Sequence, residues 1–428
     1  MRPEARCVLA FTFGFFMLPL FLSAQWLEPA IAVGDQPSAL AWNSTDNKIY
    51  CANFGSSDVT VINGESNAVI ITIGIADGTG ALVYNADYNK VYCASLWSDH
   101  VTVIDGAADT VLTTIIVDSI PVALVYNHEP SDSKVYCANF WNNSVTVING
   151  VSDTAITAIA VGDGPWVLLH NSTGNKVYTA NLNSDDVTVI DGTADTVITT
   201  TPVGDEPHAL VWNALGNKVY CTNWADNNIT VIDGLSDTII TTISVVPGPH
   251  ALAWNSNDNK VYCTNNDAIT VIDGITDTVI TTIADAGGPF ALLYNPCNNK
   301  VYCAHRLGNY VKVIDGAADT VITTIQVGIE PIAFTWNSIQ NRTYVANVES
   351  DSVSVIRDVI GITEGRVLHV PSKYYSTIII DGPLLIPEGK EYRVFDITGR
   401  FVEPARIPRG IYFVKIEGQV SHKVVKVR

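Results

Sequence analysis

The sequence KVYCTN occupies Lys218–Asn223 and recurs unchanged at Lys260–Asn265. Close variants stand at Lys48–Asn53 (KIYCAN) and Lys134–Asn139 (KVYCAN). The third position is a tyrosine in eight copies, whose spacings are 42, 44, 42, 42, 42, 40 and 42 residues. These tyrosines are Tyr50, Tyr92, Tyr136, Tyr178, Tyr220, Tyr262, Tyr302 and Tyr344. A fixed period of about 42 residues indicates a repeat architecture in which each copy is one structural unit.

One full copy, residues 209–248, predicts four short strands. The segments ALVWN, KVYCTN, ITVIDG and TIITTISV, here called strands A to D, are rich in β-branched and aromatic residues. Asn, Asp, Gly and Pro separate them and favour turns. The repeats show no sustained helical period, and their Pro and Gly would interrupt helices. Four strands in each repeat of this length are typical of a propeller blade.

The two ends of the repeat region predict how the ring closes. A lone strand of the D type, residues 28–37, comes first, and the last copy has strands A, B and C but no D before Asp358. The N-terminal strand can therefore complete the last blade and remove two bare sheet edges. We predict an all-β fold for residues 25–357, an eight-bladed propeller of four-stranded antiparallel blades. Seven blades are the alternative.

This region resembles the YVTN-type β-propeller repeat family. The resemblance lies in Tyr344-Val345-Ala346-Asn347, in Tyr220-Cys221-Thr222-Asn223, and in the recurrent frame VTVIDG…DTVITTI.VG..P.AL. It extends over residues 28–357, and cysteine replaces the second residue of the motif in six copies. The resemblance implies a propeller of microbial surfaces and secreted proteins. It implies no single chemistry, because propellers host many.

Six cysteines occupy the same place in strand B, where the other two copies have Thr179 and Val345. Equivalent residues of neighbouring blades lie on sheets about 10 Å apart, whereas a disulfide needs Cα atoms within about 7 Å. The same spacing prevents one metal from binding several of these thiolates. We expect a small apolar filler between blades, and we expect Cys297, in an A–B turn, to be exposed. The six are Cys51, Cys93, Cys137, Cys221, Cys263 and Cys303.

The charge distribution argues against a nucleic-acid partner. The chain has 43 acidic and 24 basic residues, and residues 1–357 alone carry 35 acidic against 13 basic ones. Binding to a phosphate backbone rests on clustered Lys and Arg. From Asp358 onward the balance reverses to 11 basic and 8 acidic residues. This change in composition predicts a domain boundary there.

The N-terminus predicts an export signal over residues 1–24. Arg2 and Arg6 precede an apolar run from Cys7 to Leu22, and Ser23-Ala24 supplies small residues for cleavage. A membrane anchor is the alternative, but the run is shorter than the ~20 residues that a spanning helix needs. We expect a secreted or cell-surface protein whose mature chain has no transmembrane segment.

The C-terminal residues 366–428 predict a small β-sandwich that follows a linker, residues 358–365. Its candidate strands lie in STIIIDG, KEYRVFDITGRFV, RGIYFVKIEG and SHKVVKVR. The segments YRVFDITGR, IPRGIYFVKIE and the terminal KVVKVR resemble the C-terminal sorting domain of the type IX secretion system. That resemblance implies an address recognised by outer-membrane secretion machinery. A plain β-sandwich module is the alternative.

The two faces of the predicted disc differ in how their loops vary. The A–B turns repeat a polar pattern, for example NSTDNK, NSTGNK and NSNDNK, and the C–D turns repeat DGxxDT almost unchanged. We therefore interpret their carboxylates as turn-forming. The D–A and B–C loops on the other face vary and carry aromatic residues, which either contact a ligand or cap the blade tops. The residue before strand A is, around the ring, Ser38, Gly80, Val122, Trp166, His208, His250, Phe290 and Ile332. B–C loops add Phe54, Trp97, Phe140, Trp141, Trp224, Arg306 and Tyr310.

These patterns favour a binding or scaffold module for a protein or carbohydrate ligand at the cell envelope. The candidate ligand-binding residues are Trp166, His208, His250, Phe290, Trp97, Trp141, Trp224 and Arg306. The alternative is a lactonase-like hydrolase or lyase at the channel mouth around His208 and His250. The sequence has no HExxH, GxSxG or P-loop motif. We therefore predict no catalytic residue, no metal and no cofactor.

Overall fold

The computed structural model describes residues 25–129, 133–358, 376–380, 392–396, 410–416 and 419–426. The chain divides into two compact units, Met1–Gly361 and Ile362–Arg428. The predicted export signal and most of the predicted linker, residues 359–365, lie outside the described residues. No helix of the described part is long and apolar enough to cross a membrane.

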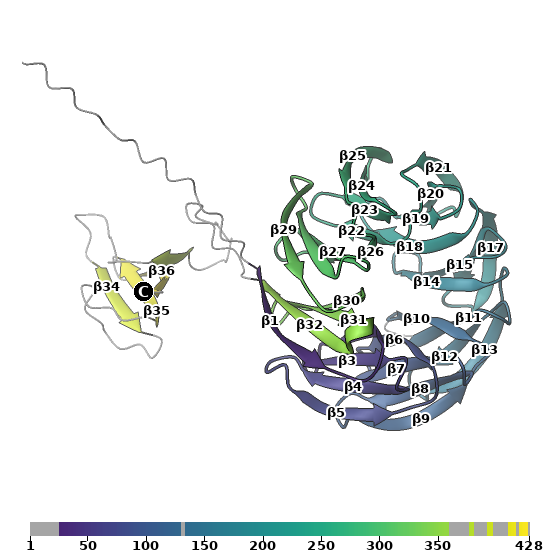
Figure 1. The fold of residues 1–428 in the computed structure, drawn as a ribbon, viewed down its shortest axis with the longest axis horizontal. Helices are drawn as coiled ribbons and strands as arrows, with labels where there is room; N and C mark the ends of the chain where they lie inside the picture. The colour runs from purple at the N-terminus through teal and green to yellow at the C-terminus, as the bar shows by residue number, and fades with distance from the viewer. Residues whose placement is uncertain are drawn as a thin grey trace, which may run out of the picture. The chain divides into compact units, whose positions relative to one another are not determined.

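The first unit is a ring of eight four-stranded antiparallel sheets, which confirms the eight-bladed propeller (Figure 1). Blades 1 to 4 are β2 (Pro37–Asn43), β3 (Lys48–Asn53), β4 (Asp58–Asn63), β5 (Val69–Gly74); β6 (Thr79–Asn85), β7 (Lys90–Ser95), β8 (His100–Asp105), β9 (Thr110–Ile116); β10 (Pro121–Asn127), β11 (Lys134–Asn139), β12 (Ser144–Asn149), β13 (Thr154–Ala160); and β14 (Pro165–Asn171), β15 (Lys176–Asn181), β16 (Asp186–Asp191), β17 (Thr196–Pro202).

Blades 5 to 8 complete the ring. They are β18 (Pro207–Asn213), β19 (Lys218–Asn223), β20 (Asn228–Asp233), β21 (Ile239–Ser244); β22 (Leu252–Asn255), β23 (Lys260–Asn265), β24 (Ala268–Asp273), β25 (Thr278–Ala284); β26 (Pro289–Asn295), β27 (Lys300–His305), β28 (Tyr310–Asp315), β29 (Thr320–Gln326); and β30 (Pro331–Asn337), β31 (Arg342–Asn347), β32 (Ser352–Asp358), β1 (Gln25–Ala32). A 3-10 turn, η1 (Val348–Ser350), links β31 and β32.

The order of the strands within a blade follows from their burial. Consecutive A strands contact one another around the ring, so strand A lies innermost. Strands B and C form the buried middle of each blade, and strand D lies at the exposed rim. Each blade packs on the next through a cluster that joins the tyrosine of one strand B to the cysteine position of the following blade, for example Tyr50 with Cys93. These inter-blade clusters form the core.

The ring closes through β1, as the strand offset predicted. β1 pairs antiparallel with β32, from Gln25 opposite Asp358 to Ala32 opposite Ser352. Three boundaries differ from the prediction. The closing strand begins at Gln25 rather than residue 28, and it ends at Ala32 rather than residue 37. β32 continues to Asp358, which the prediction placed in the linker. Asp358 belongs to the propeller because its carboxylate is buried and accepts hydrogen bonds from Gln25 and Tyr302.

A repeated ladder of polar contacts explains why the motif begins with Lys and Tyr. In blades 1 to 7, both side chains reach an aspartate at the strand C–D end of the next blade. Lys48 pairs with Asp109 at 2.8 Å, and the Tyr50 hydroxyl donates to the same carboxylate at 2.6 Å. The corresponding ion pairs are Lys90–Asp153, Lys134–Asp195, Lys176–Asp237, Lys218–Asp277, Lys260–Asp319 and Lys300–Asp358. The carboxylates of the repeated turns are therefore used structurally.

The filler interpretation of the strand B cysteines is confirmed. All six are fully buried with free thiols, and each lies in an inter-blade cluster beside the tyrosine of the preceding blade. Val345 takes the same place next to Tyr302. Cys297 is exposed, as predicted.

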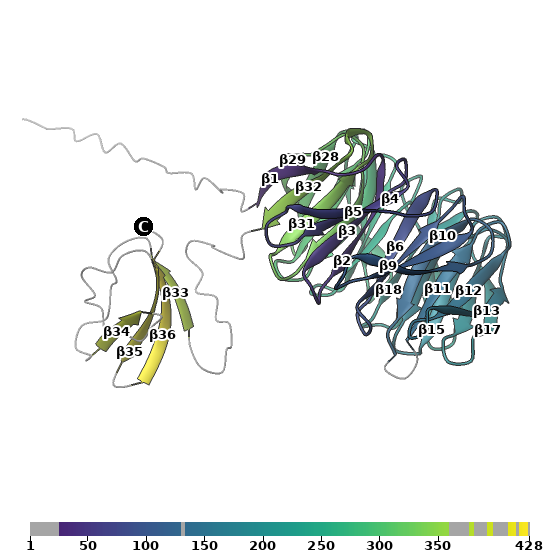
Figure 2. The same ribbon diagram turned by 90° about the horizontal axis from the view of Figure 1, so that it is seen from below.

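In the second unit, the described residues form one four-stranded sheet in the order β33 (Ser376–Ile380), β36 (Gln419–Lys426), β35 (Gly410–Ile416) and β34 (Tyr392–Asp396) (Figure 2). β33 runs parallel to β36, and the other pairs are antiparallel. β33, β34 and β35 fall within the predicted segments, whereas β36 begins at Gln419, two residues before the predicted SHKVVKVR. The second layer of a sandwich and the sorting role stay predictions.

Candidate functional site

The channel mouth is built by a bulge that recurs at the start of strand A. In blade 4, Pro165 pairs with Asn181 and Val167 pairs with Ala180, so Trp166 between them has no partner on strand B. A bulge beside a site re-aims the side chain that it releases. In seven of the eight blades, the bulge therefore places one variable side chain at the channel mouth. The prediction placed these residues before strand A, but all except His250 lie inside it. The same shift leaves the following residues without a partner on strand B: Ser38, Gly80, Val122, His208, Phe290 and Ile332.

Four of these residues form a continuous arc over blades 4 to 7. The ring centroids of Trp166 and His208 lie 5.6 Å apart. Those of His208 and His250 are 4.3 Å apart, and those of His250 and Phe290 are 4.4 Å apart. The guanidinium of Arg306 lies 5.4 Å from the centroid of the Phe290 ring, within cation–π range. The structure thus brings together five of the predicted site residues.

The mouth is one-sided. The remaining positions of the ring carry Ser38, Gly80, Val122 and Ile332, which have no aromatic ring. Ser38 is engaged with backbone, because its hydroxyl bonds to the carbonyl of Thr79 at 3.0 Å. A ligand that stacks would therefore meet a suitable surface only over blades 4 to 7.

Both histidines of the arc are held neutral. Burial, reinforced by the neighbouring His250, lowers the pKa of His208 to about 4. Burial also lowers the pKa of His250, and the charge of Arg306 acts in the same direction. His250 Nδ1 lies 3.1 Å from the carbonyl oxygen of Phe290, which places the proton of the neutral ring on Nδ1 and leaves Nε2 as an acceptor. Near pH 7 the arc is an uncharged stack with Arg306 at one end.

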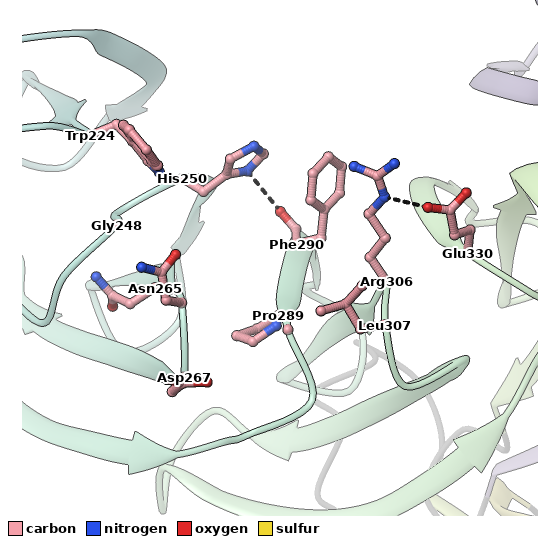
Figure 3. A pocket seen from close by; sticks show the side chains of 12 residues that line it. Trp224, Gly248, His250, Asn265, Asp267, Pro289, Phe290, Arg306, Leu307 and Glu330 are labelled. Atoms are coloured by element: carbon pink, nitrogen blue, oxygen red, sulfur yellow. Dashed lines mark hydrogen bonds and ion pairs between the residues drawn. The ribbon is translucent and has the colours of Figure 1, made fainter.

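A hollow of about 630 Å³ opens beside the arc on the same face (Figure 3). Trp224, His250, Phe290 and Arg306 line it, so four predicted residues meet there. The hollow arises from an indel. Asn266 and Asp267 alone link β23 to β24, whereas four residues link strands B and C in the other seven blades. The residues that sequence reasoning missed are Gly248, Asn265, Asn266, Asp267, Gly288, Pro289, Leu307 and Glu330. The 40-residue spacing after Tyr262 was the signal that could have found them.

Arg306 stands at the polar edge of the hollow. Its Nε donates to Glu330 at 2.8 Å, and its side chain is 45% exposed (Figure 3). Nearby Asn266 and Asp267 are exposed. The hollow therefore combines flat apolar side chains with amide, carboxylate and guanidinium groups, and this pairing suits small molecules with both apolar and hydrogen-bonding surfaces.

The remaining predicted residues lie apart or at the margin. Trp141 extends the arc indirectly, because Phe140 contacts both Trp141 and Trp166 at 6.2 and 5.9 Å between centroids. Trp97 pairs instead with Phe54 at 6.4 Å over blades 1 and 2. A Cβ atom on Gly78 would come within 2.4 Å of the Trp97 ring, so this tryptophan covers a loop. Trp97 therefore lies outside the arc.

Among the described residues, no group of three or more His, Cys, Asp and Glu side chains is arranged to hold a metal ion. The two stacked histidines therefore do not make up a coordination set of the kind that structural or catalytic zinc requires.

Comparisons with known proteins identify the fold. No family model matches the sequence, and no curated protein matches it. Among solved structures, hydrazine synthase of Kuenenia stuttgartiensis is similar at a TM-score of 0.55 and 16% identity, over 78% of this chain and 100% of that one. Sqt1 of Saccharomyces cerevisiae is similar at a TM-score of 0.68 and 11% identity, over 78% of this chain and 98% of that one. At these identities the likeness shows the WD40-like propeller fold alone, and the YVTN-type and sorting-domain resemblances stay predictions.

Proposed function

We propose that this protein is an exported binding module whose arc and hollow bind a carbohydrate of the cell envelope. The single observation that carries the proposal is the convergence of Trp224, Phe290 and Arg306 on one hollow at the variable face. A propeller commonly serves as a binding scaffold. The repeated face offers eight similar turns, whereas this sector of the variable face is unique within the ring.

The size and lining of the hollow favour a sugar ring over a protein surface. A volume of about 630 Å³ is in the range of small-molecule sites. Stable protein partners usually need about 800 Å² of mutually buried surface on each side. A pyranose ring presents an apolar C–H face that Phe290 or Trp224 can cover. Its hydroxyl edge can bond to Asn266, Asp267 and Arg306.

The charges of the hollow favour a neutral sugar. Arg306 is already paired with Glu330, and Asp267 adds a second carboxylate. A uronic acid would have to approach these carboxylates, and like charges in a partly enclosed site repel each other. Neutral hexoses and N-acetylhexosamines avoid that cost.

The proposal is tested on an array of defined oligosaccharides that covers neutral β-linked glucose, mannose and N-acetylglucosamine chains and matched uronic acid chains. Three proteins are compared: the full chain, a hollow variant Trp224→Ala/Phe290→Ala, and a control Tyr88→Ala/Leu215→Ala. The control removes exposed apolar side chains from A–B turns of the opposite face. Binding of neutral chains that only the hollow variant loses supports the proposal.

Three outcomes would redirect the proposal. Loss in the control variant alone would place the site on the repeated face. Binding of the full chain to uronic acid chains alone would reject a neutral ligand. Turnover of a lactone or glycoside panel that disappears with His250→Gln would move the protein to the hydrolase or lyase class.

A further inference from the structure

At the junction of blades 6 and 7, three positions depart from the repeat and meet in space. Strand B ends in His305, where six other blades have Asn and blade 2 has Ser95. Strand C carries Lys312, where the other blades have Thr or Ser354. The residue after strand D of blade 6 is Asp285, where the other copies have Val or Ile75. In the usual arrangement the amide donates to the hydroxyl, as Asn223 does to Thr230 at 2.8 Å.

The three substituted side chains form a buried ionic cluster. His305 Nε2 lies 2.5 Å from Asp285 Oδ2, and Lys312 Nζ lies 2.6 Å from Asp285 Oδ1. The side chains of His305 and Asp285 are fully buried. Burying charges is costly even when they are paired, and seven blades fill this place without such a cluster. Because the cluster occurs at one place in the ring, we infer that it has a role particular to that place and is not a general requirement for blade stability.

Hydrogen bonds fix the orientation of the His305 ring. Its Nδ1 lies 3.0 Å from the carbonyl oxygen of Cys303, which only accepts, and its Nε2 faces the Asp285 carboxylate. Burial opposes ionisation of Asp285, but the hydrogen bonds from His305 and Lys312 lower the pKa of its carboxyl below the ordinary value. An ionised Asp285 accepts only, so Nε2 of His305 carries a proton and donates to it.

The cluster is joined directly to the wall of the hollow. The backbone N–H of Asp285 donates to the carbonyl of Asp267 at 2.8 Å. The next residue after His305 is Arg306, whose backbone N–H donates to the carbonyl of Gly288 at 3.1 Å. Asp267, Gly288 and Arg306 all line the hollow. These backbone bonds recur in the other blades. What is particular here is that the side chain of Asp285 also binds His305 and Lys312, and so ties the connection that leads to Gly288 to the strand that ends before Arg306.

Other groups around His305 complete its surroundings. Tyr310 of β28 stacks on the imidazole with centroids 4.4 Å apart. The tyrosine also lies against the loop before β26, where a Cβ on Gly287 would come within 1.8 Å of its hydroxyl. The titratable groups that face His305 are therefore Asp285 from the D–A connection, Tyr310 and Lys312 from β28, and the buried Cys303 of its own strand. Burial and the Asp285 charge raise the pKa of that thiol, so it stays neutral.

We propose that Asp285, His305 and Lys312 are positioning residues that set the shape of the hollow. The inference rests on the proposed function only in taking the hollow as the binding site. Asp285 lies in the connection that leads to Gly288, and His305 directly precedes Arg306. Loss of the bonds between Asp285, His305 and Lys312 should therefore let both wall segments move.

The test needs no ligand, so its failure is distinct from failure of the carbohydrate screen. The full chain is prepared with 4-fluorophenylalanine at Phe290, which reports the hollow by ¹⁹F NMR. The consensus variant Asp285→Val/His305→Asn/Lys312→Thr carries the residues that other blades already use. We expect the ¹⁹F resonance of the consensus variant to be displaced from that of the parent protein at the same neutral pH.

Two controls keep the result specific. His250 also contacts Phe290, but its pKa is lowered, so its ring stays neutral at the neutral pH of the comparison. Should the consensus variant fail to fold, Asp285→Asn removes the charge within the same shape, and its ¹⁹F resonance should also be displaced from that of the parent. An ¹⁹F resonance that is identical in all three proteins would overturn the proposal.

Discussion

The hydroxyl of Tyr344 donates to the amide oxygen of Asn67 at 2.7 Å, across the only blade junction where the ladder does not end on an aspartate. The missing carboxylate comes from Glu28 on the closing strand. Arg342 pairs with Glu28 at 3.0 Å, and Asn67 Nδ2 donates to Glu28 at 2.6 Å. Strand β1 thus supplies both backbone pairing and the charge that the junction needs.

The first prediction concerns Asn67. Aspartate is the residue that other copies of the turn carry, yet Asn67→Asp should destabilise this protein. The change removes a donor to Glu28 and places two carboxylates side by side in a partly buried site, at a cost of about 1–3 kcal/mol. Thermal unfolding at pH 7 measures the effect. The double variant Asn67→Asp/Glu28→Gln should recover most of the loss. An Asn67→Asp protein as stable as the parent would contradict the role assigned to Glu28.

The second prediction concerns closure. Deletion of residues 26–33 removes nearly all of β1 and bares the edge of β32, which should lower the unfolding temperature and cause aggregation through that edge. Size-exclusion chromatography and calorimetry check this, with a deletion of residues 1–24 as the control. A shortened protein that stays monomeric with an unchanged unfolding temperature would refute closure by β1.

The third prediction concerns cysteine reactivity. Burial raises the pKa of the strand B thiols, such as Cys51 and Cys93, and shields them from reagents. Of the cysteines from Cys51 onward, one, Cys297, should react rapidly with a thiol reagent in the native protein, and the other six only after unfolding. Cys93→Val should lower the free energy of unfolding by less than about 1.5 kcal/mol, because Val345 already occupies the equivalent position in blade 8. Disulfides among the strand B cysteines in non-reducing mass spectra would be inconsistent with this packing.

The fourth prediction concerns acid stability. The pKa of His208 is lowered from 6.5 to about 4 on folding. A depressed pKa contributes stability that is fully present above pH 6.5 and is lost as pH falls toward 4, with an upper bound on the order of 3 kcal/mol. His208→Gln should therefore lose less stability between pH 7 and pH 4 than the parent protein does. Equal losses in both proteins, measured by denaturant titration at each pH, would show that His208 is not desolvated as described.

The sequence predicted the repeat, the blade number and the closing strand because these depend on period and on β-branched alternation, which are local. It also predicted the arc, since Trp166, His208, His250 and Phe290 occupy equivalent places in consecutive repeats. Aligning repeats within one chain substitutes for structural knowledge when every copy has the same fold.

The hollow and the ionic cluster escaped prediction for a physical reason. Asp267, Arg306 and Glu330 come from loops of three different blades, and their meeting depends on a loop that is two residues short. Asp285, His305 and Lys312 occupy three different positions of the repeat. Each is unusual only when it is compared with the residues at the same position in the other copies. The sequence analysis interpreted the ladder aspartates as turn residues. Their second role is to accept hydrogen bonds from the Tyr and Lys of the preceding blade, and it could be predicted only by knowing how neighbouring blades are placed.

The most direct test of the account is calorimetric titration of the best neutral oligosaccharide from the array into three proteins: the parent, Trp224→Ala/Phe290→Ala and the opposite-face control Tyr88→Ala/Leu215→Ala. Aromatic anchors commonly contribute about 2 kcal/mol or more each when truncated. We therefore predict at least a ~30-fold weaker Kd for the hollow variant and an unchanged Kd for the control. A hollow variant that binds as tightly as the parent, or a control that loses binding instead, would contradict the assignment of the arc and hollow as the functional site.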